Sequence, residues 1–258
     1  NLLECLKKHG YETAYFGHNH VFDNLLNGRN RKGENVSDYH SFTQGYFDHI
    51  LQNKHPVQQP GPDSAKNISR PEAVNLEVHC VTAPREGFDD DNRADQAVHY
   101  LRNVRDKSKP FYMHLNFGAP HPPYKVEEPY FSMYDRDGIR PYVYVLPEGA
   151  PLPLKKMREI RAGEHAGEAD FRQIQAVYYG MITKLDVLIG RVLDEIMDQG
   201  LLEDSIVMFW VDHGDFAGQY GLLEKWDTAM QDCILHVPQT LYAPGLPQGR
   251  CIDALTEH

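Results

Sequence analysis

The sequence predicts an α/β fold in which a mostly parallel central sheet is flanked by helices on both faces. Runs of β-forming residues alternate with amphipathic helical segments along the chain, an order typical of such sheets. One run, residues 205–211, is apolar without alternation, as in a strand covered on both faces. Polar residues follow the predicted strands, and open α/β sheets bind ligands at the carboxyl ends of their strands.

The N-terminal region predicts a helix followed by a strand. Residues 1–10 have the pattern of the last turns of a helix, and Gly10 is a suitable C-cap. Residues 11–16 are rich in β-forming side chains and predict a buried strand. The loop that follows this strand contains His18 and His20.

A long polar stretch separates this strand from the next helix. Residues 27–87 are polar and contain proline, so we expect mostly loop, with one short aromatic strand at 45–51. Residues 92–107 carry apolar side chains at helical spacing, and a proline follows them. Residues 111–117 then predict the next strand.

The exit of that strand is rich in proline. Residues 118–124 contain three prolines, which remove backbone donors and fix φ, so His121 is expected on a stiff, non-helical loop. Residues 124–164 are charged, contain prolines and lack periodicity. We interpret this segment as an insertion or loop that covers the site.

The C-terminal half contains the longest predicted helix. Residues 168–199 place apolar side chains on one stripe, and Gly200 is a typical stop signal. The apolar strand at 205–211 follows, and a weaker strand is predicted at 237–242. Strands therefore continue to alternate with helices to the end of the chain.

Composition excludes several classes of protein. With 258 residues, 41% of them hydrophobic, the chain can form a substantial core. A net charge of −11 without a basic cluster argues against a nucleic-acid partner, and no apolar run is long enough to span a membrane. The cysteines are Cys5, Cys80, Cys233 and Cys251. Their spacing matches no zinc-binding motif, and the sequence does not decide whether any two of them form a disulfide. None of these features assigns the protein to a compartment.

The local motif with the clearest chemistry is Asp212-His213-Gly214-Asp215, directly after the apolar strand. A carboxylate and an imidazole both bind divalent cations, and Gly214 permits a close backbone approach. The same residues also suit a polar turn in which Asp212 caps the following segment. These four positions alone do not decide between a metal site and a turn.

The positions of four other polar side chains support a functional role for them. Taken singly, a histidine or lysine on a loop is most often a solvated surface residue. The histidines and the lysine that lie at or beyond the ends of predicted strands are His18, His20, His121 and Lys225. A metal, cationic groups and a proton donor are what hydrolysis of an anionic ester requires.

Four segments carry the motifs of one known family, in that family's order. They are LKKHGYETAYFGHNH at residues 6–20, FYMHLNFGAPHPPY at 111–124, the helix at 178–200, and residues 205–225 with D-H-G-D, G-x-x-G-L and a lysine. With these motifs the chain resembles the sulfatase family of the alkaline phosphatase superfamily. The resemblance implies the α/β core of that superfamily.

The resemblance also implies roles for individual residues. Asp212 and His213 would be metal ligands, and the metal in this family is usually Ca²⁺, sometimes Mg²⁺ or Mn²⁺. His121 and Lys225 would act in catalysis and bind sulfate oxygens. His20 would act in catalysis by supporting the nucleophile.

Two departures from the family pattern are relevant. The substrate-binding residue His18 stands where the family usually has lysine, so a permanent cation becomes a group charged only below the ordinary histidine pKa of about 6.5. The family's formylglycine motif, Cys/Ser-x-Pro-x-Arg, and its paired aspartates should precede His18 but do not appear in the sequence. We therefore expect residues 1–258 to be a sulfatase catalytic domain truncated at both ends, with formylglycine in a preceding segment.

The function implied is hydrolysis of a small-molecule or glycan sulfate ester, such as a sulfated sugar, by metal-assisted nucleophilic attack at sulfur. Two alternatives stay open. One is a phosphonate or phosphate ester hydrolase of the same superfamily, because charge, metal and histidines serve phosphorus nearly as well. The other is a sulfatase-like domain that binds sulfated ligands without turnover. We expect the 258-residue chain alone to be inactive.

Overall fold

The computed structural model of the protein describes residues 2–17, 39–40, 80–81, 90–140, 145–160, 166–225 and 229–253. The chain forms two compact units. Unit 1 comprises Asn1–Ala65, Ala83–Pro120 and Met181–Glu195, and unit 2 comprises Lys66–Thr82, His121–Gly180 and Ile196–His258. His18, His20 and the strand predicted at 45–51 lie outside the described residues.

Unit 1 is built on a three-stranded parallel sheet. Its central strand, β1 (Glu12–Gly17), lies between β2 (Tyr39–His40) and β4 (Phe111–Asn116), and both neighbours run parallel to it. All residues of β1 after Glu12 are buried, as in a strand covered on both faces. The strands predicted at 11–16 and 111–117 are confirmed.

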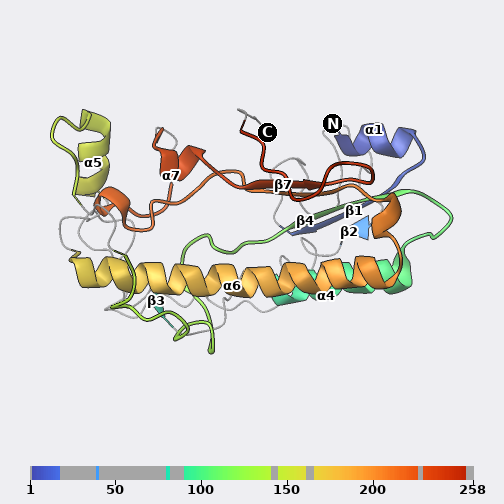
Figure 1. Ribbon diagram of the computed structural model, residues 1–258, viewed down its shortest axis with the longest axis horizontal. Coiled ribbons are helices and arrows are strands. Elements are labelled where there is room, and N and C mark those ends of the chain that lie inside the picture. Colours follow the sequence, from blue (N-terminus) through green and yellow to red (C-terminus); the bar gives the residue numbers. More distant parts are fainter. Residues whose placement is uncertain are drawn as a thin grey trace, which may run out of the picture. The chain divides into compact units, whose positions relative to one another are not determined.

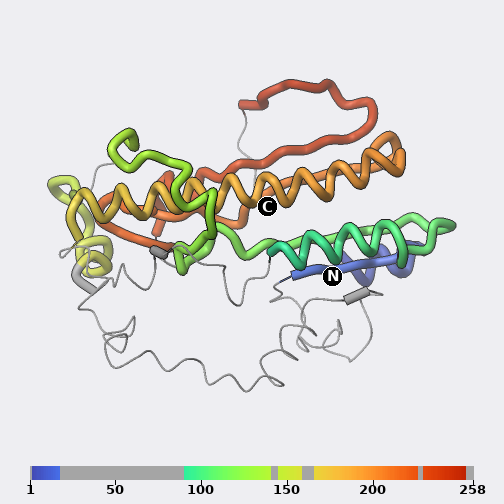
Figure 2. The backbone as a smooth tube through the Cα atoms, turned by 90° about the horizontal axis from the view of Figure 1, so that it is seen from below, coloured from blue at the N-terminus to red at the C-terminus, as the bar shows by residue number. Residues whose placement is uncertain are grey.

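Helices cover both faces of this sheet (Figures 1 and 2). They are α1 (Leu2–Lys8) and α4 (Asp90–His99), which the π-helical turn η1 (Tyr100–Val104) continues. Successive side chains of a strand point to opposite faces, so Tyr15 packs with Leu3 of α1. On the other face, Phe16 meets the ring of Tyr100 edge-on, with centroids 5.8 Å apart.

A buried polar cluster fixes the exit of β4. Asp90 Oδ1 accepts hydrogen bonds from Gly118 N at 2.8 Å and from Arg93 Nη1 at 2.9 Å, while Oδ2 accepts one from Ala119 N at 2.9 Å. Arg93 also donates to the carbonyl of Asn116 at 3.0 Å. Because Asp90 and Arg93 are both buried, these bonds are shielded from water and hold the backbone after β4 in one conformation.

The long helix α6 (Glu168–Asp198) matches the helix predicted at 168–199. The predicted apolar stripe is buried at its clearest positions, among them Phe171, Ile174 and Leu188. Gly200 has a φ of +67°, a left-handed conformation that suits the end of a helix. Sequence periodicity therefore located both the helix and its buried face.

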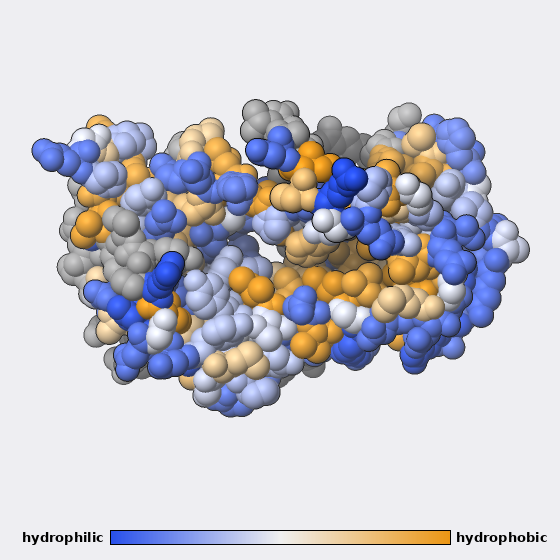
Figure 3. Space-filling view, in the orientation of Figure 1, coloured by the Kyte–Doolittle hydropathy of each residue, from blue (hydrophilic) through white to orange (hydrophobic). Residues whose placement is uncertain are grey.

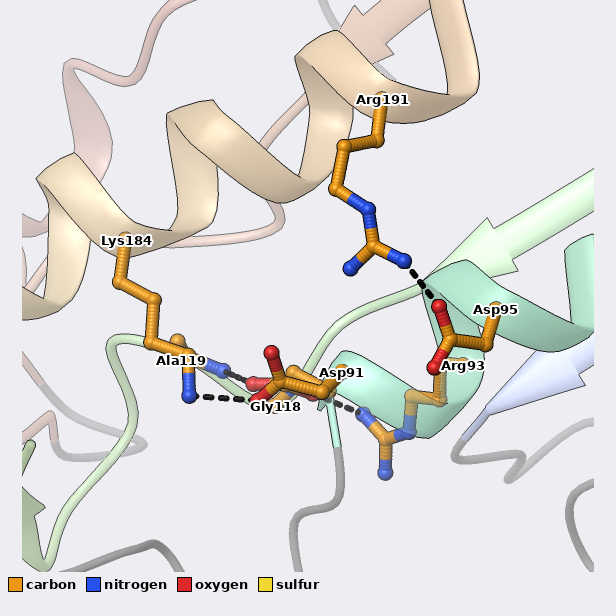
Figure 4. Close-up of polar contacts among 8 residues, drawn as sticks. Asp91, Arg93, Asp95, Gly118, Ala119, Lys184 and Arg191 are labelled. Carbon is orange, nitrogen blue, oxygen red and sulfur yellow. Dashed lines mark hydrogen bonds and ion pairs between the residues drawn. The ribbon is translucent and has the colours of Figure 1, made fainter. Parts of the chain in front are cut away.

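Within unit 1, charged side chains of α6 meet α4 (Figure 4). Lys184 Nζ lies 2.5 Å from Asp91 Oδ2, and Arg191 forms an ion pair with Asp95. Apolar side chains also gather over α6 on the face shown in Figure 3, and the exposed apolar residues of this helix include Ile182 and Val187. No described helix is both long and apolar enough to cross a membrane.

The described residues of unit 2 form two short strand pairs. Strand β3 (Cys80–Val81) runs parallel to β5 (Tyr124–Lys125), whereas β6 (Val207–Trp210) runs antiparallel to β7 (Gln239–Tyr242). Its short helices are α5 (Leu152–Ile160), the turn η2 (Leu202–Asp204), the turn η3 (Gln219–Gly221) and α7 (Asp232–Leu235). Its core cluster consists of Leu154, Met157, Phe216, Leu222, Ala229 and Ile234.

Two predictions for unit 2 need correction. A strand is present within 205–211, but β6 pairs antiparallel and its Met208 and Trp210 side chains are each 48% exposed. Coverage on both faces in a parallel sheet is therefore wrong for the described residues, because a short apolar run shows that a strand forms but not what covers it. The segment 124–164, read as aperiodic, contains helix α5. That the segment 124–164 covers the site stays a prediction.

Candidate active site

The turn after β6 brings a carboxylate and an imidazole together. Asp212 Oδ1 accepts a hydrogen bond from the backbone N of His213 at 3.0 Å. His213 Nδ1 lies 2.8 Å from the carbonyl oxygen of Gly214. Since a carbonyl only accepts, Nδ1 carries a proton, and a neutral ring in this orientation would have its lone pair on Nε2. That Nε2 atom lies 3.6 Å from Asp212 Oδ2.

This donor pair suits a divalent cation. Ligands at roughly 2.0–2.4 Å from one ion lie about 3–3.6 Å from each other, which the Oδ2–Nε2 separation matches. The Asp212 side chain is 82% exposed, so an ion can reach it. Within the described part of the chain, no third His, Cys, Asp or Glu joins the pair. Asp212 and His213 would therefore supply part of a coordination sphere.

Gly214 keeps this turn against helix α7. Its backbone N donates to the carbonyl of Ile234 at 2.7 Å. A Cβ atom built on Gly214 would lie 1.9 Å from the carbonyl oxygen of Cys233, a distance that forbids any side chain. The predicted close backbone approach at Gly214 is confirmed.

A second pair of side chains consists of His121, in the loop after β4, and Lys225, which follows the Asp212–His213 turn in sequence. Lys225 Nζ lies 2.5 Å from His121 Nε2. His121 Nδ1 lies 2.6 Å from the carbonyl oxygen of Pro122, so Nδ1 donates and Nε2 accepts from the ammonium group. The pair thus places an ammonium group and an imidazole in contact at the surface of unit 2.

A third group, which the sequence did not reveal, joins the buried Tyr124 to Asp215. Tyr124 Oη donates to Asp215 Oδ1 at 3.0 Å and to Oδ2 at 3.1 Å. Asp215 Oδ1 also accepts from Ala217 N at 2.7 Å and from Glu224 N at 3.2 Å. Burial, more than any neighbour, raises the pKa of both the Asp215 carboxyl and the Tyr124 hydroxyl. Both residues stood inside recognised motifs, but no spacing rule links positions 91 residues apart.

The loop between Asp215 and Lys225 is folded tightly on itself. Phe216 N donates to the carbonyl of Glu224 at 3.0 Å, and Gly218 N donates to that of Leu222 at 2.8 Å. The non-glycine residues in this loop that have positive φ are Ala217 at 44°, Tyr220 at 60° and Glu224 at 63°. Such conformations are sparsely populated and cluster at functional sites.

Three cysteines of the described residues have free thiols. Cys5, Cys233 and Cys251 are free. Burial is the largest cause that raises the pKa of Cys233 to about 11, so its thiol is protonated at neutral pH and is a poor metal ligand or nucleophile.

Comparisons with known proteins agree with the motifs. The sequence model of the Sulfatase family matches residues 1–258. The chain is 28% identical, over 260 residues, to the multifunctional alkaline phosphatase superfamily protein PehA of Trinickia caryophylli, covering 87% of the chain and 49% of that protein. It is 24% identical to iduronate 2-sulfatase of Homo sapiens over 215 residues, covering 74% of the chain and 38% of that protein.

A solved structure supports the fold. The phosphonate monoester hydrolase SpPMH from Silicibacter pomeroyi matches with a TM-score of 0.66 over 98% of this chain and 54% of its own, at 18% identity. This likeness confirms the predicted α/β architecture. The chain spans about half or less of the length of the two curated relatives, at 49% and 38%.

Proposed function

Because this chain belongs to the sulfatase family, we propose that the whole protein hydrolyses a sulfuric ester and that unit 2 supplies part of its metal and anion site. The observation that carries the proposal is the 2.5 Å contact between Lys225 Nζ and His121 Nε2. Two residues far apart in sequence meet as a cationic pair in the same unit as the Asp212–His213 turn. An anionic ester needs both features.

In this proposal Asp212 and His213 hold a divalent cation, with Ca²⁺ favoured over Mg²⁺ or Mn²⁺ as in the family. The bound ion would supply Lewis-acid stabilisation of charge on the ester and nucleophile oxygens. The hydrogen bond from His213 Nδ1 to the Gly214 carbonyl, at 2.8 Å, fixes the ring and presents Nε2. Asp212 contributes the hard oxygen that such cations prefer.

His121 and Lys225 bind the ester oxygens. The ammonium group of Lys225 provides a positive charge, and one of its N–H bonds donates to His121 Nε2 at 2.5 Å. When an anion enters, the remaining N–H bonds of Lys225 are placed to donate to its oxygens. His121 would donate to a leaving-group oxygen only after its Nε2 atom has taken up a proton, which it would then transfer. The nucleophile expected for the family is formylglycine, whose motif does not appear in residues 1–258. For His20 we propose support of the nucleophile, and for His18 binding of the substrate.

For the substrate we propose a sulfated sugar or another small sulfate ester. This proposal is supported by the similarity to iduronate 2-sulfatase of Homo sapiens, at 24% identity. The alternative substrate is a phosphonate or phosphate ester. Two observations favour testing this alternative. They are the likeness in fold to a phosphonate monoester hydrolase and the histidine at position 18.

The test is the hydrolysis of matched aryl sulfate, phosphate and phosphonate esters by the whole protein with calcium supplied. Faster turnover of the sulfate supports the proposal. Faster turnover of a phosphorus ester would assign the protein to the alternative chemistry. Binding of inorganic sulfate with no turnover of any ester, sulfated sugars included, would indicate a non-catalytic binding domain.

A further inference from the structure

We infer that Asp215 and Tyr124 form a positioning pair that holds Lys225 against His121. The inference rests on the proposed function, because it concerns the residues that would bind the ester oxygens. Neither Asp215 nor Tyr124 is assigned a contact with substrate or metal. Their effect would pass through the backbone of the segments that carry the cationic pair.

The first step is the number of donors that the Asp215 carboxylate accepts. They are the Tyr124 hydroxyl at 3.0 and 3.1 Å, the Ala217 N at 2.7 Å and the Glu224 N at 3.2 Å. The Tyr124 residue is only 2% exposed, so water does not replace its hydroxyl. Hydrogen bonds of a carboxylate in such an enclosed place are individually strong.

The second step is the backbone of Glu224, the residue immediately before Lys225. Its φ of 63° lies in the left-handed region, which is unfavourable for a non-glycine residue and persists only where the surrounding structure holds it. Three hydrogen bonds retain it there. Glu224 N donates to Asp215 Oδ1 at 3.2 Å and to Tyr124 Oη at 3.3 Å, and its carbonyl accepts from Phe216 N at 3.0 Å.

The direction of Lys225 depends on this conformation. Rotation of Glu224 into the ordinary right-handed or extended region would turn the chain that carries Lys225 away from its present course. Lys225 Nζ lies 2.5 Å from His121 Nε2, and such a turn of the chain would break this contact. The bonds made by Asp215 and Tyr124 therefore oppose the loss of the cationic pair.

The third step is the other end of the pair. Tyr124 stands three residues after His121, and the two residues between them are prolines, whose rings limit backbone rotation. Anchoring Tyr124 to Asp215 therefore anchors His121 as well. The same two side chains fix both segments whose ends meet at the cationic pair.

The test uses Tyr124→Phe and Asp215→Asn in the whole protein with an aryl sulfate. Tyr124→Phe removes one donor to the carboxylate and one acceptor for Glu224 N. Asp215→Asn keeps one acceptor oxygen but places an amide donor opposite the Tyr124 hydroxyl. We expect kcat/KM to fall about 10- to 100-fold, while the calcium dissociation constant changes by less than about threefold.

A purely structural role is separated from positioning by repeating each substitution in a Lys225→Met background. If Asp215 and Tyr124 act through Lys225, each should then cost less than about threefold in kcat/KM. The matched control is Asp170→Asn, which alters another carboxylate that accepts a backbone hydrogen bond, from Gly167 N at 2.8 Å. It should leave kcat/KM unchanged.

Two results would overturn the inference without touching the proposed function: unchanged kcat/KM in Tyr124→Phe and Asp215→Asn, or an equal loss with and without Lys225. If the wild-type protein turns over no ester, the proposed function fails, and the inference is then decided by a crystal structure of Tyr124→Phe. Separation of Lys225 Nζ from His121 Nε2 in that structure supports positioning, and retention of the contact contradicts it.

Discussion

Lys225 donates a hydrogen bond to His121 across 104 residues of sequence. His121 lies among the prolines at the exit of β4, and Lys225 ends the tight loop that begins at Asp215. Neither residue is distinctive alone, because solvated lysines and loop histidines are common. Their contact turns two ordinary side chains into a cationic pair, and the expected behaviour of the site depends on it.

Removing His213 should weaken metal binding. A His213→Ala variant of the whole protein loses the Nε2 donor that lies 3.6 Å from Asp212 Oδ2. We expect calcium affinity, measured by titration calorimetry, to fall by at least about tenfold. His99→Ala, at an exposed histidine of α4, is the control and should bind calcium like the wild type. Equal affinity in His213→Ala would exclude His213 as a ligand.

Adding one methyl group at Gly214 should disturb both stability and metal binding. In Gly214→Ala the new Cβ would lie 1.9 Å from the Cys233 carbonyl oxygen, so the turn must shift, at a cost of about 1–3 kcal/mol or more. Gly190→Ala is the control, because its Cβ meets nothing within 4 Å on helix α6. That change should stabilise by about 0.5–1 kcal/mol. Thermal unfolding and calcium titration distinguish them, and equal melting temperatures would contradict the described turn.

Truncating Asp90 should be costly to unit 1. Asp90→Ala leaves the buried Arg93 guanidinium without its carboxylate and removes the acceptor for Gly118 N and Ala119 N. Breaking a buried ion pair in this way costs about 3–5 kcal/mol. Asp95→Ala, which removes an exposed ion pair with Arg191, should cost less than about 1 kcal/mol. Urea unfolding measures both, and similar losses in the two variants would argue against the Asp90 cluster.

Cys233 should react slowly with alkylating reagents. Only the thiolate is nucleophilic, and a pKa of about 11 gives Cys233 roughly a hundredfold less thiolate at pH 8 than an ordinary cysteine. The rate should rise about tenfold per pH unit until the pH approaches that pKa. Peptide mass spectrometry after timed iodoacetamide treatment gives the rate at each cysteine. A rate at Cys233 equal to that at exposed Cys5 would contradict the described burial.

Much of the fold follows from local sequence signals. Helical periodicity located α6 and its end at Gly200, and β-forming runs located β1 and β4. What the sequence did not provide was the environment of each element. The apolar run that forms β6 was predicted to be covered on both faces, and this was wrong, because pairing and coverage depend on distant segments.

The candidate site shows the same division. The close approach at Gly214 was predicted, because a glycine between polar residues after a strand often marks tight backbone contact. The bonds from Tyr124 and Glu224 to Asp215 were not predicted, because no rule of spacing connects residues 91 positions apart. Asp212, His213, His121 and Lys225 were all chosen from sequence, and the structure brings the last two into contact.

The central claim is that His121 and Lys225 act as one unit on a sulfate ester. It is tested most directly by a double-mutant cycle in the whole protein, with sulfate release from an aryl sulfate measured for His121→Ala, Lys225→Ala and the double variant. Residues that act together are strongly non-additive, so we predict that each single change lowers kcat/KM nearly as much as both. Losses that multiply independently, or single variants with wild-type rates, would contradict the account.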